Sequence, residues 1–242
     1  WLVAKGYTAD TYANNAAGMD NTIWRQFISA DDPLRQRITF ALSELLVVSV
    51  LGVSTFYRQF AIANYLDILE SNAFGNYRTL LGEVTLSPVM GHYLSMFKNR
   101  KPDPTLNIRP DENYAREIMQ LFSVGLWQLN QDGSRKLDGS NAPIPTYTQA
   151  GVKEMARTLS GWTYPDVPGQ AYRSTNNENF TGPMVPRPEN HDKGAKTLFG
   201  TTICRSSGVL TRIYPIVISS ITPVSRPVGA DSCTRSPTSN GW

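Results

Sequence analysis

The sequence contains only two histidines and two cysteines in 242 residues, which limits the catalytic and metal chemistry that it can carry. Any histidine-based site must use His92 or His191, and neither Cys204 nor Cys233 lies in a zinc-binding spacing. The sequence also lacks a His-Glu-x-x-His pair, a nucleophile elbow and a glycine-rich phosphate loop. The corresponding zinc peptidases, serine hydrolases and nucleotide hydrolases are therefore disfavoured.

Long uncharged apolar runs are missing as well, so no membrane span is predicted. The most apolar stretch, residues 38–53, is interrupted by several polar residues, by Glu44 and by Gly52, and it predicts a core helix. The chain begins with Trp1 rather than methionine. We therefore expect an incomplete N-terminus, which leaves room for a signal peptide ahead of it.

The net charge of +3 comes entirely from the end of the chain. Residues 201–242 contain four arginines and one aspartate, which leaves 19 basic and 19 acidic residues in residues 1–200. A neutral body argues against nucleic acid or an anionic membrane as a partner. The last segment also holds both cysteines and is rich in serine, threonine and proline. We expect it to be an atypical tail, frameshifted or otherwise foreign to the fold, that packs poorly.

Helical periodicity dominates the body of the sequence. Capping residues and apolar repeats predict seven helices, which begin near Asn21, Pro33, Ser54, Asn76, Pro88, Pro110 and Thr148. The second helix should be buried almost all round at residues 46–51 and form the hydrophobic centre with residues 114–122. The predicted fold is mainly α, a single helical domain over residues 1–200 with a small β-hairpin and long irregular loops.

Residues 108–127 hold the clearest of these helices, with the sequence IRPDENYAREIMQLFSVGLW. Pro110 suits a first turn, and Asp111 and Glu112 favour the positive end of the helix dipole. One face, which must be buried, is apolar and consists of Tyr114, Ala115, Ile118, Met119, Leu121, Phe122 and Gly125. Polar residues share another stripe, namely Asn113, Arg116, Glu117 and Gln120, with Arg109 one turn earlier.

The period changes after this helix, and residues 127–137 predict the β-hairpin. Two short extended runs flank Gln131-Asp132-Gly133, and Asp-Gly is typical of a tight hairpin turn. An alternative is a calcium loop, because oxygen-bearing side chains alternate around the glycine. That pattern lacks the full acidic spacing and the closing glutamate, so the plain hairpin is favoured.

The second concentration of ionisable groups is residues 190–196, Asn-His-Asp-Lys-Gly-Ala-Lys, at the end of a long irregular stretch over residues 163–190. A histidine beside a carboxylate can act as a general base or metal ligand, and Lys193 and Lys196 can bind an anion. Alternatively, Asp192 caps a turn and His191 simply packs. His92, in contrast, lies on a predicted helix and is interpreted as a structural histidine.

We predict that this loop folds back onto the N-terminal half of the helix in residues 108–127, because a charge beside an apolar face needs a partner. Arg116 and Glu117 would then face His191 or Asp192 across a polar cleft. The candidate catalytic residues are His191, Asp192, Glu117 and Arg116, and the candidate ligand-binding residues are Arg109, Asn113 and Lys196. His191 would be a base or ligand, Asp192 its orienter and Arg116 an anion clamp. Alternatively, these groups form a structural ion-pair network.

Three separated motifs carry a family resemblance: RPDENYARE at residues 109–117, LSGW at 159–162 and HDKGAK at 191–196. Over residues 20–200 the chain resembles the bacterial domain of unknown function 1800 family. Matching motif positions are Arg109, Asn113, Arg116, Glu117, Gly161, Trp162, His191, Asp192, Gly194 and Lys196. The resemblance implies a largely helical bacterial protein, commonly exported to the periplasm or beyond and often encoded beside sulfatase-like proteins. It brings no established reaction, metal or cofactor.

Two classes of function follow. The first is an exported enzyme, or an enzyme's partner, that acts on an extracellular polymer. The second is a non-catalytic protein of the cell envelope that acts in assembly or interaction. Family members continue with further helices after the His-Asp loop, so the resemblance also implies that this chain is a truncated member.

Overall fold

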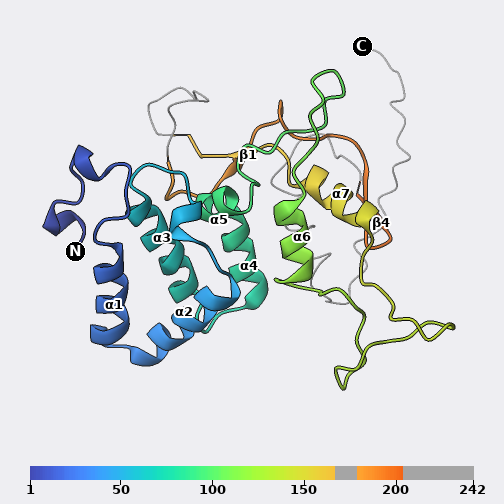
Figure 1. Cartoon of the computed structure of the whole chain (residues 1–242), viewed down its shortest axis with the longest axis horizontal. Coiled ribbons are helices and arrows are strands. Elements are labelled where there is room, and N and C mark those ends of the chain that lie inside the picture. The colour runs from blue at the N-terminus through green and yellow to red at the C-terminus, as the bar shows by residue number, and fades with distance from the viewer. Residues whose placement is uncertain (167–178, 204–242) are drawn as a thin grey trace, which may run out of the picture.

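The computed structural model describes residues 1–166 and 179–203 (Figure 1). Seven α-helices lie in these residues: α1 Met19–Ser29, α2 Pro33–Leu45, α3 Arg58–Ser71, α4 Tyr77–Leu86, α5 Pro88–Tyr93, α6 Asn113–Gln120 and α7 Gln149–Thr158. Three short 3-10 helices are Val3–Lys5, Asp10–Tyr12 and Val50–Gly52. The prediction of a mainly helical fold is confirmed, and no helix in the described ranges is long and apolar enough to cross a membrane.

The strands form two small antiparallel pairs. β1 Trp162–Thr163 pairs with β2 Val185–Pro186, and β3 Lys196–Leu198 pairs with β4 Thr201–Ile203. β4 covers the first three residues of the predicted tail, and the rest of that tail lies outside the described residues. Residues 167–178 of the predicted long loop lie outside them too, while its ends contribute to the β1–β2 pair.

The hydrophobic core lies between α3, α4, α5, α6 and α7. Fully buried side chains from all five helices meet there, among them Tyr65, Leu69, Leu81, Val84, Val89, Met90, Ile118, Met119 and Met155. Local sequence sets two of the helix starts, because Asn76 accepts the Arg78 N–H and Thr148 accepts the Gly151 N–H. Pro88 occupies the first turn of α5, where its missing N–H is harmless.

The prediction that residues 46–51 continue the second helix and are buried on all sides is wrong. α2 ends at Leu45, and the carbonyl of the buried Leu46 accepts a hydrogen bond from the hydroxyl of Tyr65 on α3. Leu45 and Leu51 are largely exposed. A tertiary hydrogen bond therefore terminates α2 where the apolar pattern alone would extend it.

α2 is also turned so that polar residues face inward. Gln36 and Thr39 are buried, while Leu34, Phe40 and Leu45 are exposed. Gln36 donates from Nε2 to the carboxylate of Glu70 on α3 at 2.9 Å. The Thr39 hydroxyl donates to the Arg35 carbonyl, also at 2.9 Å. Leu34, Phe40 and Leu45 thus point away from the core, while Leu42 packs against it.

α6 begins at Asn113, not at the predicted Pro110. The side chain of Asn99 binds the backbone of Asp111 twice, at 2.8 Å to its N–H and at 3.0 Å to its carbonyl. These contacts hold the preceding residues in a non-helical path. The predicted apolar face is buried at Tyr114, Ala115, Ile118, Met119 and Phe122, but Leu121 is exposed.

The predicted turn at Gln131-Asp132-Gly133 is present, and it belongs to a larger element, residues 126–146, which we name the arm. Its three extended segments pair in a closed cycle of hydrogen bonds: Gln128 N–H to Ile144 O at 2.9 Å, Ile144 N–H to Lys136 O at 3.0 Å, and Lys136 N–H to Gln128 O at 2.8 Å. The bonded residues recur every eight positions. Each segment therefore pairs with both of the others.

The arm projects from the body beyond α6 and α7, where it is the yellow-green trace with two pointed loops in Figure 1. Asp132 Oδ1 fixes one loop by accepting from the N–H and hydroxyl of Ser134, at 2.9 and 2.6 Å. Asp138 Oδ1 fixes the other by accepting the N–H groups of Ser140 and Ala142. Such turns make the loops rigid through local contacts.

Tyr65→Phe tests the hydrogen bond that ends α2. Removal of the hydroxyl leaves the buried Leu46 carbonyl unpaired, and we expect the free energy of unfolding to fall by about 1–3 kcal/mol in urea titrations. Tyr57→Phe is the matched control, because its hydroxyl binds the Thr8 carbonyl in an exposed setting at 3.2 Å. Equal losses in the two variants would contradict the explanation.

Candidate functional site

The His191-Asp192 loop packs against the C-terminal end of α7. Gly161, three residues after the last residue of α7, has φ +86°, and a Cβ there would lie 2.7 Å from the backbone nitrogen of His191. Its N–H donates to the Asn99 carbonyl at 2.6 Å, and its carbonyl accepts from the Arg187 N–H at 2.7 Å. Glycine is therefore required both for the backbone conformation and for the close approach of the loop.

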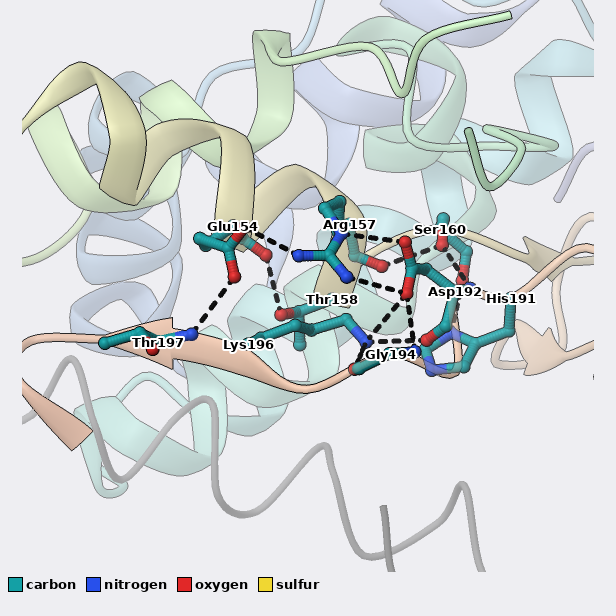
Figure 2. Close-up of polar contacts among 9 residues, drawn as sticks. All are labelled: Glu154, Arg157, Thr158, Ser160, His191, Asp192, Gly194, Lys196 and Thr197. Carbon is teal, nitrogen blue, oxygen red and sulfur yellow. Dashed lines mark hydrogen bonds and ion pairs between the residues drawn. The ribbon is translucent and has the colours of Figure 1, made fainter. Parts of the chain in front are cut away.

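Asp192 is the centre of the polar contacts in Figure 2. Arg157 of α7 binds its carboxylate with two donors, Nε at 2.7 Å and Nη2 at 3.1 Å. The Gly194 N–H adds a third bond at 2.8 Å, and Lys196 Nζ lies 3.4 Å from Oδ1. Burial alone would raise the pKa of Asp192, but Arg157, Gly194 and Lys196 outweigh it and lower the pKa to about 2.

Lys196 is a buried cation whose ammonium is fully engaged by the loop. Its Nζ donates to the carbonyls of Asp192 at 2.6 Å and Gly194 at 2.8 Å. Burial lowers the pKa of Lys196, and the charge of Asp192 opposes that shift. Arg157 also pairs with Glu154 at 2.7 Å, and Glu154 accepts the Thr197 N–H of β3 at 3.1 Å. The network thus fastens β3 and its loop to α7.

His191 is only 2% exposed and has a defined tautomer. Its Nδ1 lies 2.8 Å from the Ser160 carbonyl, which can only accept, so Nδ1 carries the hydrogen. Burial lowers the pKa of His191, which keeps the ring neutral. Nε2 therefore presents a lone pair, and it has no hydrogen-bond partner within residues 1–166 and 179–203.

Residues 6–212 match the family described as "Protein of unknown function (DUF1800)". The chain belongs to the DUF1800 family. The predicted resemblance is confirmed, and the matched stretch extends past residues 20–200 at both ends. Neither a curated protein nor a solved structure matches the chain.

The DUF1800 motif residues divide into two separate groups in the structure. Gly161, His191, Asp192, Gly194 and Lys196 meet at the end of α7. Arg116 instead binds Glu112 at 3.1 Å and Gln149 at 3.0 Å. The prediction that Arg116 and Glu117 face His191 or Asp192 is therefore wrong. α7 contacts both α6 and β3, and its Arg157 supplies the partner that α6 was expected to provide.

The remaining predicted residues lie around α6. Arg109 and Asn113 are exposed, and the Asn113 N–H donates to Asp111 Oδ1 at 2.8 Å. Glu117 is half-buried, and its Oε2 has no hydrogen-bond partner in the described part of the chain. The sequence analysis assigned no role to Arg157 or Ser160, which bind Asp192 and His191. The sequence signal for Arg157 is the charged last turn of α7, and Ser160 belongs to the LSGW motif that follows it.

Two other predicted features have structural explanations. His92 donates to or accepts from the Tyr164 hydroxyl at 2.7 Å and stacks on Phe97 at 4.1 Å. Burial, with help from Lys98, lowers the pKa of His92 to about 4. The calcium alternative finds no support, since Asp132 and Asp138 bind their own turns. No group of three or more His, Cys, Asp or Glu that could hold a metal occurs among the described residues.

Gly161→Ala tests the contact between α7 and the loop in this DUF1800 domain. Gly125→Ala is the matched control, because Gly125 has φ +73° and its added Cβ meets nothing within 4 Å. The control should lose about 1–2 kcal/mol of unfolding free energy from backbone strain. Gly161→Ala should lose more than twice as much, because the Cβ also meets the His191 backbone. Similar losses would show that the close approach is unimportant.

Asp192→Asn tests the ionic network. The amide leaves the buried Lys196 without its counter-charge and Arg157 with Glu154 alone, so we expect a loss of about 3–5 kcal/mol in chemical denaturation. Asp166→Asn is the control, since Asp166 pairs with Arg187 at 2.6 Å but its side chain is exposed, and it should lose under about 1 kcal/mol. A near-neutral Asp192→Asn would contradict a structural role for the network.

Proposed function

We propose that this DUF1800 domain is a non-catalytic assembly or interaction protein of the bacterial cell envelope. The observation that carries the proposal is the arm. Residues 128–142 are fifteen consecutive exposed residues, and yet the cycle of hydrogen bonds fixes their backbone. An ordered element with so little contact to the body has no evident role in stabilising it.

Order in the arm favours binding, because a rigid element loses little conformational entropy when it docks. Its three cross-strand pairs are Trp127 with Pro145, Leu129 with Arg135, and Leu137 with Pro143. Directly opposed residues project to the same side of paired strands. Arg135 also lies over the Trp127 ring, 5.5 Å from its centroid. The arm therefore presents a surface of fixed shape with exposed apolar side chains and balanced charges, Arg135 and Lys136 with Asp132 and Asp138.

The chemistry at the end of α7 supports a structural role for the motif residues there. The Asp192 carboxylate and the Lys196 ammonium are occupied by internal partners. A catalytic carboxylate or amine needs a free electron pair or proton at its substrate, and neither group offers one in this arrangement. The network instead holds β3 in place and so maintains the shape of the domain.

The enzyme alternative, an exported enzyme or enzyme partner that acts on an extracellular polymer, retains one specific observation in its favour. The neutral His191 ring presents an unpartnered Nε2 within the described chain, which is the form of a general base or metal ligand. In that alternative, Ser160 rather than Asp192 orients the ring. A sulfatase-like protein is a candidate partner under either function.

A photo-crosslinking residue at position 131, on the arm, tests the assembly function in cells that produce the protein. Position 106 is the control, because Leu106 is 61% exposed and lies outside the arm. We expect a discrete protein adduct, identified by mass spectrometry, from position 131 and none from position 106. Leu129→Ser with Leu137→Ser should abolish that adduct. The absence of an adduct at position 131 would contradict the proposal.

A parallel measurement addresses the enzyme alternative directly. The purified protein is assayed on a panel of polysaccharide and ester substrates with metal content measured alongside. Assembly predicts no turnover, whereas turnover that His191→Asn abolishes at unchanged melting temperature would establish the enzyme and overturn the proposal.

A further inference from the structure

The two histidines of the chain hold opposite ends of one short segment, residues 160–164, which contains β1 and which we name the clamped segment. At one end, His191 Nδ1 donates to the Ser160 carbonyl at 2.8 Å. At the other end, His92 Nε2 lies 2.7 Å from the Tyr164 hydroxyl. All five residues of the segment are buried. Histidine is the side chain that ordinarily changes charge between pH 5 and 8, so both such side chains of this protein act on the same segment.

His191 gains no partner when its ring takes up a second proton. Its Nε2 is buried and has no hydrogen-bond acceptor in residues 1–166 and 179–203. Lys193 and Lys196 oppose the added charge, and Asp192, which favours it, already binds Arg157 of α7 (Figure 2). A protonated His191 is therefore a buried cation whose new N–H donor has no acceptor, and such a group is costly.

His92 lies in a comparable environment. Its ring stacks on Phe97 with centroids 4.1 Å apart, and the Tyr164 ring lies 5.8 Å away. The charged group that acts on His92 is Lys98, whose ammonium lies over the Phe97 ring, 5.0 Å from its centroid. A proton on His92 thus places a second cation beside Lys98 in a largely buried site.

The other ionisable groups around the clamped segment are carboxylates, lysines, arginines and tyrosine. Two further ion pairs flank it, Glu154 with Arg157 on α7 and Asp166 with Arg187. Groups of these kinds ordinarily titrate outside the range from pH 5 to 7.5, and the pKa of Asp192 is about 2. Within that range, the groups around the segment that change charge are therefore the two histidine rings.

The direction of the pH effect follows from burial. Burial lowers the pKa of both rings below the ordinary value of 6.5, which applies once a ring is in water. The released segment then binds protons more tightly than the clamped one, so the clamp is strongest above pH 6.5 and weakens as the pH falls. For His92, a pKa of 6.5 in water and about 4 when buried favours release about thirtyfold at pH 5. His191 acts in the same direction.

We propose that the clamped segment and the His191 loop form an acid-sensitive switch, which opens in mild acid while the remaining helical core and the arm stay folded. The switch goes beyond the proposed assembly function and does not depend on whether the arm binds a partner. Opening exposes Trp162 and Tyr164, which are 7% and 5% exposed when the segment is clamped. The arm contains no histidine, so its shape does not change over the same pH range.

Hydrogen exchange of the full chain at pH 7.5 and pH 5, corrected for the pH dependence of the chemical exchange rate, measures the opening in each part of the structure. Protection of residues 159–164 and 187–203 should fall by about thirtyfold or more at pH 5. Residues 61–69 of α3 and 80–86 of α4 are the internal control, and their protection should change by less than about threefold. Unchanged protection of residues 159–164 at pH 5 would overturn the proposal.

Neutral substitutions of the histidines separate the switch from general acid sensitivity. His191→Asn places an amide N–H near the position of Nδ1, and His92→Gln places an amide near the position of Nε2, so each can keep its hydrogen bond without titrating. The double variant should lose the pH response of the segment, whereas His191→Asn alone should keep the contribution of His92, about thirtyfold. A full response in the double variant would show that the histidines do not control the opening.

A measurement on the wild type replaces any variant that circular dichroism shows to be unfolded at pH 7.5. NMR titration of the two histidine rings gives the pH at which each takes up its proton. Both rings should do so at the pH at which the segment loses its protection. Uptake by either ring near pH 6.5 while the segment remains protected would contradict the switch.

Discussion

The ion pair between Asp192 and Arg157 is the interaction on which the C-terminal half of the structure depends. Its two parallel hydrogen bonds join a loop to a helix that is separated from it by more than thirty residues. Lys196 and Glu154 extend the pair into a network that reaches β3. Buried charges are stable only when each has a partner, so the network also dictates that the loop, α7 and β3 adopt one relative arrangement.

Local features were predictable from the sequence, because their energetics involve residues only a few positions apart. Asn76 and Thr148 cap their helices as expected, and Asp132-Gly133 forms its turn. The seven helices and the family follow from the same patterns. Features that depend on distant contacts were not predictable. The Tyr65 hydroxyl ends α2, and Asn99 delays the start of α6 by binding Asp111.

The candidate site was half predictable for the same reason. The residues of the His191-Asp192 loop were identified as a cluster because they are adjacent in sequence. Their partner was misassigned, since a charged stripe on α6 and a charged last turn on α7 look alike without tertiary information. Arg116 proved to be satisfied by Glu112 and Gln149. Ionisable groups in a motif therefore indicate that a charge is needed, and only packing tells whether the charge serves stability or chemistry.

The arm and the body are stabilised by different kinds of contact. The body depends on a core and an ionic network that join distant parts of the chain, whereas the arm depends on hydrogen bonds within residues 126–146. Local contacts cost little chain entropy to form. The arm can therefore keep its shape without burying its leucines, and those side chains remain available to a partner. On α2, exposed apolar side chains have a different cause, because Gln36 takes an inward position beside Glu70 and leaves Leu34 and Phe40 exposed.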